Sequence, residues 1–280
     1  MRRASNPLPL PLVFILPLFL FVYGCSDNHN SLNGAGAGQT RVVLTDDPGD
    51  FDAVNLSVVE IAAHHTGGSD AHGWEIISTD AIQLDLMSLQ NGVFLTLADA
   101  LLPAGSYDML RLKLGEGSTF MAGGVTSPLT VPGGLQSGLK IMGPFTVSQG
   151  RSLEMQIDFD AQRSIRLENG TYVLQPVLRL LPSTSAGAIS GTVQPASRGI
   201  QVEVLQGDEV VATARTRADG FFAAHVLPAG TYVVRITLPN GNVKILQDVT
   251  VTGGSTNELG SVTLSDDGEP ANPPRTDDGV

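Results

Sequence analysis

Apolar and polar residues alternate with a period of two over much of the chain, which is the pattern of a half-buried β-strand. The clearest stretch runs from 139 to 160. One parity there holds the apolar residues on both sides of a glycine-containing turn at 148–150: Leu139, Ile141, Phe145, Val147, Leu153, Met155, Ile157 and Phe159. The pattern predicts two strands that are joined by the turn and that face one core.

Elsewhere the alternation shifts phase or gives way to short apolar runs. Val54, Leu56 and Val58 alternate, and Val59 and Ile61 continue on the opposite parity. This slip indicates a β-bulge or a strand that is buried on both faces. Only Ser88 to Leu101 has a pattern that could hold a short helix.

One short motif occurs twice, as Leu-Pro-Ala-Gly-Ser-Tyr at 102–107 and as Leu-Pro-Ala-Gly-Thr-Tyr at 227–232. Proline and glycine favour a turn, and a β-prone run follows each copy. We expect Tyr232 to start a strand with its ring inward and its hydroxyl bonded to nearby backbone. Gly170-Thr171-Tyr172 opens a further predicted strand, so we interpret the motif as structural and not catalytic.

The strand rhythm divides the chain into two parts. A strand at 172–181 closes the first part near Pro182, and a short polar linker follows at Ser183–Gly187. Ile189 to Leu264 then carries about seven short apolar runs separated by turns, which is typical of a small sandwich. We predict an all-β fold of two tandem antiparallel β-sandwiches, at 40–182 and 187–264. The acidic, proline-rich end at 265–280 predicts disorder.

The N-terminal residues predict export. Met1-Arg2-Arg3 precedes an apolar run from Leu8 to Tyr23, so residues 1–24 have the form of a secretory signal peptide. Val22-Tyr23-Gly24-Cys25 resembles a bacterial lipobox, which implies a lipidated Cys25 and a flexible tether at 25–39. The alternative is an ordinary cleavage site beside an incidental cysteine. Cys25 is the only cysteine, so no disulfide can form within the chain.

The net negative charge of the chain argues against anionic partners. The net charge is −12, and loss of Arg2 and Arg3 with the signal would lower it by two to −14. An acidic body repels nucleic acid and anionic headgroups, so we expect no nucleic-acid partner and a membrane attachment through the lipid anchor alone. The predicted location is the bacterial envelope, at the outer membrane or cell surface, with polysaccharide or envelope proteins as partners.

Several motifs in a fixed order resemble the DUF4382 family of exported bacterial domains over roughly residues 40–182. They are LTDDPGDFDAVNLSV, LMSLQNGV, LPAGSYDMLRL, LTVPGGLQSGLKI, IDFDAQRSI and YVLQPVLR. The family has no established activity. The second part, with GAISGTV and RTRADGFFAAHVLPAGTYVVRI, resembles the carboxypeptidase regulatory-like domain, a prealbumin-like sandwich that is grouped with carbohydrate-binding-like folds. This resemblance implies a module for stability or presentation, and a fold alone licenses no function.

Two sets of residues are candidate binding sites. Calcium prefers oxygen ligands, and Asp46, Asp47, Asp50 and Asp52 crowd one turn, although Pro48-Gly49 already explains a plain strand connection. Apart from calcium, we predict no cofactor. Aromatic side chains can stack on sugars, which makes Phe221, Phe222 and Tyr232 candidate ligand contacts, with core packing as the alternative.

The sequence gives weaker support to a catalytic site than to these binding sites. Glu154, Asp158 and Asp160 share one outward parity. The distance between neighbouring residues on one face of a strand reaches the range for paired glycosidase carboxylates, but a solvated strand face explains the same pattern. His72-x-x-Glu75 lacks a third zinc ligand, and the adjacent His64 and His65 point to opposite faces.

The prediction that follows is a non-enzymatic lipoprotein with a binding, adhesion or structural presentation role. A carbohydrate-binding surface protein is the first alternative, and an envelope hydrolase is the second.

Overall fold

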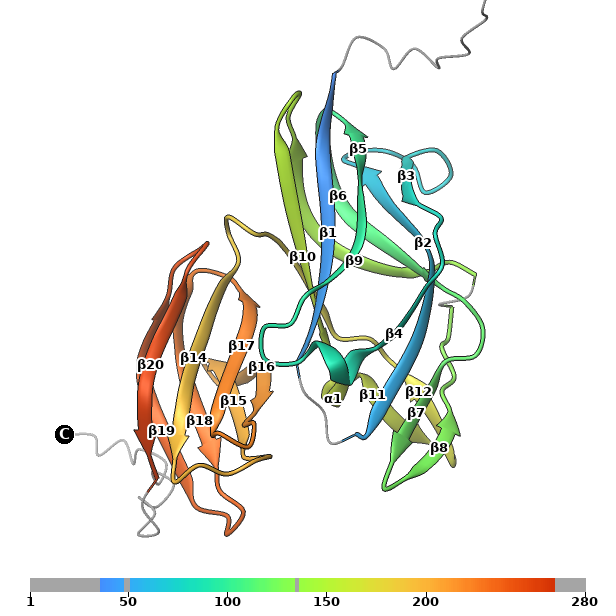
Figure 1. The fold of residues 1–280 in the computed structure, drawn as a ribbon. Helices are drawn as coiled ribbons and strands as arrows, with labels where there is room; N and C mark the ends of the chain where they lie inside the picture. Colours follow the sequence, from blue (N-terminus) through green and yellow to red (C-terminus); the bar gives the residue numbers. More distant parts are fainter. Residues whose placement is uncertain (1–35, 48–50, 134–135, 265–280) are drawn as a thin grey trace, which may run out of the picture. The chain divides into compact units, whose positions relative to one another are not determined.

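The computed structural model describes residues 36–47, 51–133 and 136–264, and it confirms the predicted all-β sandwich fold (Figure 1). The predicted signal peptide, Cys25, most of the predicted tether and the C-terminal tail lie outside the described residues. The tether was predicted to extend to residue 39, which is too far. Strand β1 begins at Ala37, because residues 37–39 already pair with a neighbouring strand. No helix in the described ranges is long and apolar enough to cross a membrane.

The first part of the chain forms two main sheets. The smaller has the strand order β13-β10-β1-β5, and the larger has the order β8-β7-β2-β6-β9, with β3 and β4 also paired to β2. All of these neighbours are antiparallel except β1 and β10, which run parallel. The strands are β1 (Ala37–Asp47), β2 (Ala53–His65), β3 (Trp74–Ser78), β4 (Ile82–Asp85), β5 (Leu95–Pro103), β6 (Gly105–Leu114), β7 (Thr119–Ala122), β8 (Val125–Pro128), β9 (Leu139–Val147), β10 (Ser152–Asp160) and β13 (Leu178–Pro182). A separate hairpin joins β11 (Ile165–Glu168) to β12 (Thr171–Leu174), after the short helix α1 (Ala161–Ser164).

The alternation at 139–160 produces the two predicted strands, but they lie in different sheets. β9 belongs to the larger sheet and β10 to the smaller one. Ile141, Phe145 and Val147 on β9 are buried in the same core as Met155 and Ile157 on β10. The shared parity therefore arises because the two strands face one core from opposite sides. The turn at 148–150 connects the two sheets.

The phase slip near residue 58 is a β-bulge, the first of the two predicted alternatives: the register between β2 and β6 shifts between Val58 and Glu60. The helix predicted within 88–101 is wrong. Only a 3-10 turn, η1 (Leu86–Leu89), forms there, and β5 follows it. Asn91 and Gly92 both have positive φ, at 55° and 87°, which ends any helix, and pairing with β1 then holds the next residues extended.

The second part of the chain contains seven strands, as its rhythm predicts: β14 (Gly187–Gln194), β15 (Gln201–Gln206), β16 (Glu209–Arg215), β17 (Phe221–Leu227), β18 (Gly230–Thr237), β19 (Val243–Val251) and β20 (Thr256–Thr263). One sheet has the order β17-β14-β20 and the other β16-β15-β18-β19. Their facing side chains form a second hydrophobic core, separate from the core of the first part. Here β14 and β20 form the one parallel pair within these two sheets, and the other paired strands in them are antiparallel.

The repeated Leu-Pro-Ala-Gly motif builds the same arrangement twice. Tyr107 and Tyr232 are both buried, and each hydroxyl donates a hydrogen bond of 2.8 Å to the carbonyl oxygen of the motif's own proline, Pro103 or Pro228. Burial raises the pKa of Tyr107 to about 12, so its hydroxyl remains a donor at any physiological pH. The prediction for Tyr232 is confirmed, and the motif is a structural corner at the start of β6 and of β18.

We predict that Tyr107→Phe and Tyr232→Phe each lower the free energy of unfolding by about 1 kcal/mol, because each leaves a partly buried carbonyl without its donor. Urea denaturation followed by tryptophan fluorescence or circular dichroism measures this. Tyr172→Phe is the matched control, since Tyr172 packs its ring against Phe120 and donates no hydrogen bond within the described residues. Equal stability of all three variants would contradict the role given to the hydroxyls.

Candidate functional site

The structure uses two of the candidate calcium ligands to hold its own backbone. Asp46 is buried, and its Oδ1 accepts a hydrogen bond from the backbone N–H of Ala161 at 3.2 Å. Asp52 is exposed, and its Oδ2 accepts from the backbone N–H of Gly124 at 2.8 Å. Asp50 and the side chain of Asp47 lie outside the described residues. Within the described ranges no three acidic, histidine or cysteine side chains are grouped to hold a metal, and calcium binding at this turn stays a prediction.

Two of the three candidate aromatic contacts are core residues. Phe222 and Tyr232 are 0% and 2% exposed, because both point into the second core. A buried ring presents no face to a sugar, so these two residues cannot form the predicted platform. Phe221 is partly exposed, and the guanidinium carbon of Arg217 lies 4.4 Å from its ring centroid.

The histidines near the first glycine-rich loop do not converge. His64 is buried, its Nδ1 lies 2.9 Å from Asp108 Oδ1, and its ring packs against Trp74. The ring of His65 instead stacks on Tyr107, with 4.4 Å between centroids. His72 is exposed. This arrangement fixes the side chains of β2 by packing and hydrogen bonding.

The acidic face predicted for β10 is not a solvated one. Asp158 and Asp160 are each 1% exposed, while Glu154 is partly exposed. Arg179 Nη2 lies 2.5 Å from Asp158 Oδ2, and the same guanidinium donates to the carbonyl oxygens of Val211 and His225. Strands β16 and β17 of the second sandwich therefore cover this face, which the alternation alone could not indicate.

Asp160 has a second structural role. Its Oδ1 accepts a hydrogen bond from the backbone N–H of Arg163 at 2.8 Å and so caps α1. Burial raises the pKa of Asp160, and the nearby Arg163 opposes that rise only in part. A raised pKa is a property of a general acid, but this carboxyl is directed at backbone and at Arg163. The arrangement supports a structural role over the hydrolase alternative.

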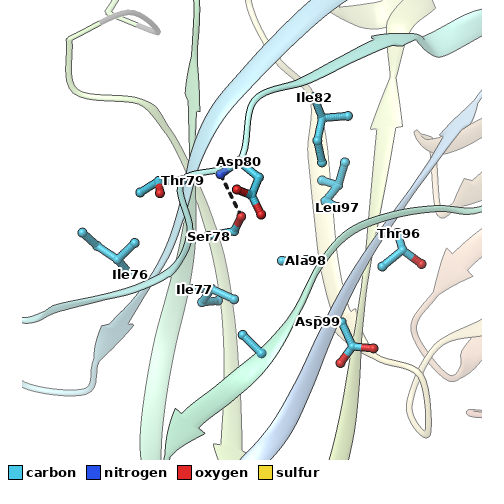
Figure 2. Close-up of a pocket in the computed structure, with 11 residues that line it drawn as sticks. Ile76, Ile77, Ser78, Thr79, Asp80, Ile82, Thr96, Leu97, Ala98 and Asp99 are labelled. Atoms are coloured by element: carbon cyan, nitrogen blue, oxygen red, sulfur yellow. Dashed lines mark hydrogen bonds between the residues drawn. The ribbon is translucent and has the colours of Figure 1, made fainter. Parts of the chain in front are cut away.

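An open groove of about 540 Å³ lies between the segment that joins β3 to β4 and strand β5 (Figure 2). Among the described residues β3 pairs only with β2 and β5 only with β1, so each has one edge without a ladder partner. Ile76, Ile82 and Leu97 give the groove an apolar wall. Its chemistry suits contact with an extended or apolar segment.

Some polar groups of this groove are already engaged in hydrogen bonds. The backbone N–H of Asp80 donates to Ser78 Oγ at 3.1 Å, as the dashed line in Figure 2 marks. Gln39 and Arg41 both bond the Asp99 carboxylate, and the hydrogen bond from Gln39 is the main reason that the pKa of Asp99 lies below its usual value. An ionised, paired carboxylate is a poor general acid.

A family model described as a domain of unknown function, DUF4382, matches residues 37–176, which is half of the chain. The chain therefore belongs to the DUF4382 family. This confirms the resemblance seen in the motifs of the first part. No curated protein matches.

Similar solved structures include pilins and a cohesin–X-dockerin complex. A cohesin–X-dockerin complex from Acetivibrio cellulolyticus is 27% identical, with 26% of this chain and 51% of that chain covered, and a TM-score of 0.23. A minor pilin of Streptococcus agalactiae is 10% identical, with coverages of 81% and 94% and a TM-score of 0.23. The major pilin of Bacillus cereus is 10% identical, with coverages of 81% and 99% and a TM-score of 0.21. At such TM-scores these likenesses carry no argument about function.

One further histidine responds to pH through burial. The His225 ring packs edge-on against Phe94, with 5.6 Å between centroids, and burial lowers its pKa. A base with a depressed pKa stabilises the fold fully above its unfolded pKa of about 6.5, and that contribution is lost as the pH falls toward the folded value.

We predict that the stability of the wild-type chain falls between pH 7.5 and pH 5.5 by more than that of His225→Gln, which cannot be protonated there. Urea midpoints at the two pH values measure the difference. His72→Gln is the control, since His72 is an exposed histidine on another part of the chain, and this variant is expected to lose as much stability as the wild type. If His225→Gln and the wild type lose the same stability, burial of His225 has no such effect.

For the acidic turn at 46–52, calcium binding predicts a melting temperature that is higher in millimolar calcium than in excess chelator. A site filled at a hundred times its Kd would stabilise the fold by about 2.7 kcal/mol. Asp50→Asn is expected to abolish the shift, whereas Asp80→Asn, which lies elsewhere on the surface, keeps it. An equal melting temperature in calcium and in chelator would contradict calcium binding at this turn.

Proposed function

We propose that this protein is a non-enzymatic lipoprotein of the bacterial envelope, anchored through Cys25, that presents two β-sandwiches for binding, adhesion or a structural role. The location that goes with this proposal is the outer membrane or cell surface. Its partners would be envelope proteins or polysaccharide, with the membrane reached only through the lipid.

The observation that carries the structural part of this proposal is the set of hydrogen bonds between the two sandwiches. Arg163 donates to the carbonyl oxygen of Val210, and Arg179 donates to those of Val211 and His225. In the opposite direction, the backbone N–H of Ala223 donates to Asn91 Oδ1 at 3.1 Å. Bonds to main-chain atoms of two strands, β16 and β17, favour a second sandwich that extends the first over one that moves independently. The described residues fall within a single compact unit.

The second sandwich is proposed to be a carboxypeptidase regulatory-like domain in an accessory role. Its Asp-Gly turn supports this: Asp219 Oδ1 accepts from the backbone N–H of Phe221 at 3.0 Å, and Gly220 takes a φ of 82°. Thr216, Gly220 and Phe222 match the motif of that family, whereas Arg217 stands where the family usually has an acidic residue. No catalytic role is proposed for either sandwich.

Carbohydrate binding is the second candidate function. Burial of Phe222 and Tyr232 argues against the aromatic platform at those residues, so this candidate depends on another surface. A polar cleft beside η1, described below, is the observation that favours it.

The anchor is tested by labelling a bacterium that expresses the full chain with an alkyne fatty acid. We expect the wild-type chain to take up the label and to sediment with membranes, and Cys25→Ser to lose both properties. Ser26→Ala is the matched control and keeps the label. Equal labelling of the wild type and Cys25→Ser would contradict the proposed attachment.

A further inference from the structure

A second hollow, of about 460 Å³, lies where η1 approaches two loops of the second sandwich. Its size falls within the range of about 300–1,000 Å³ that is usual for small-molecule sites. The first sandwich contributes Asp85, Ser88 and Gln90, and the second contributes Arg198 and Arg215. We call this hollow the arginine cleft.

Backbone hydrogen bonds hold the loop that carries Arg198. The N–H of Gly199 donates to the carbonyl oxygen of Thr216 at 2.8 Å, and the N–H of Thr216 donates to that of Ile200 at 3.1 Å. Thr216 Oγ1 also accepts from the N–H of Ile200 at 3.0 Å. Gly199 takes a φ of 83°, which favours glycine. The position of Arg198 at the mouth of the cleft is therefore fixed by its main chain.

A second guanidinium group, that of Arg215 at the end of β16, lies beside this loop. Arg215 Nη1 donates to the carbonyl oxygen of Gly199 at 3.2 Å, which places its charge beside the residue that follows Arg198. Arg198 is exposed and makes no hydrogen bond or ion pair with the described part of the chain. Arg198 and Arg215 thus both line the cleft, and two guanidinium groups at one cleft favour an anionic ligand.

The carboxylates of the cleft do not serve as that anion. Asp85 Oδ1 accepts from the backbone N–H groups of Val54 and Met87, at 2.9 and 3.1 Å, and so caps η1. Asp52 is held by Gly124, as described above. Both are committed to their own sandwich, and their remaining oxygen lone pairs can still accept hydrogen bonds.

The chemistry of the lining identifies the class of ligand. Guanidinium groups bind carboxylates through paired N–H donors, which gives both strength and orientation. The Ser88 hydroxyl, the Gln90 amide and the carboxylate oxygens offer donors and acceptors together, and a sugar hydroxyl is both. Phe51 and Met87 add apolar surface suited to the C–H face of a sugar ring. A ligand with one acid group and several hydroxyls satisfies the whole lining.

We propose that the arginine cleft binds an acidic saccharide, with the carboxylate between Arg198 and Arg215 and the hydroxyls toward Ser88, Gln90 and Asp85. The inference rests on the proposed binding role at the envelope and gives it a ligand class. It assigns recognition to a surface between the sandwiches and not to the buried aromatic residues.

The test uses residues 26–280, which contain the whole compact unit from Gly34 onward, titrated by calorimetry at low salt. The probes are a galacturonic acid trimer and a neutral galactose trimer. We expect saturable binding of the acidic trimer alone. Arg198→Ala and Arg215→Ala should each weaken it by about tenfold to a hundredfold, which is the effect of losing a hydrogen bond to a charged group. Arg198→Lys should restore part of the affinity.

Arg166→Ala is the matched control, because Arg166 is an exposed arginine on β11 and does not line the cleft; it should bind as the wild type does. Melting temperatures of all variants confirm that they are folded. Equal affinity for both trimers, no binding of the acidic trimer, or full affinity in Arg198→Ala would each overturn the proposal. The soluble chain lacks Cys25, so these outcomes are separate from the labelling result for the anchor.

Discussion

The ion pair between Asp158 and Arg179 decides how the two sandwiches can meet. A carboxylate that is 1% exposed is costly unless it is paired, and Arg179 supplies the pair at 2.5 Å. A guanidinium has five N–H donors, so the same side chain also reaches main-chain carbonyls of β16 and β17. One buried charge on β10 thus becomes the link that lets a polar strand face be covered by a second sandwich.

The contact between the two sandwiches also forms the arginine cleft. The arginine cleft takes one wall from η1 and the other from the loops around Gly199 and Thr216, so neither sandwich forms it alone. The groove of Figure 2 depends on the first sandwich only, because both of its walls are strands of that half. The two surfaces also differ in chemistry: one has arginines that can receive an anion, and the other has an apolar wall and the paired Asp99 carboxylate.

The two tyrosine corners show how a local sequence can act independently of its surroundings. The motif of proline, glycine and tyrosine at 102–107 and 227–232 gives the same 2.8 Å hydrogen bond in two sandwiches of different size and strand order. The bond spans only four residues, so no distant contact has to be known to predict it. The third tyrosine, Tyr172, lacks the preceding proline and forms no such corner within the described residues.

The sequence by itself determined the all-β class, the family of the first part and the inward Tyr232, because local alternation and short motifs carry these features. It left the bulge after Val58 as one of two alternatives. Only the tertiary structure decided the fates of 88–101, Asp158 and Phe222. Residues 95–101 became part of β5 because β1 offered an edge. Asp158 was buried because β16 and β17 cover β10, and Phe222 was buried because its side of β17 faces the second core. The arginine cleft could not be predicted from the sequence either. Ser88 and Arg198 are 110 positions apart in the chain and line one cleft only because the two sandwiches are in contact.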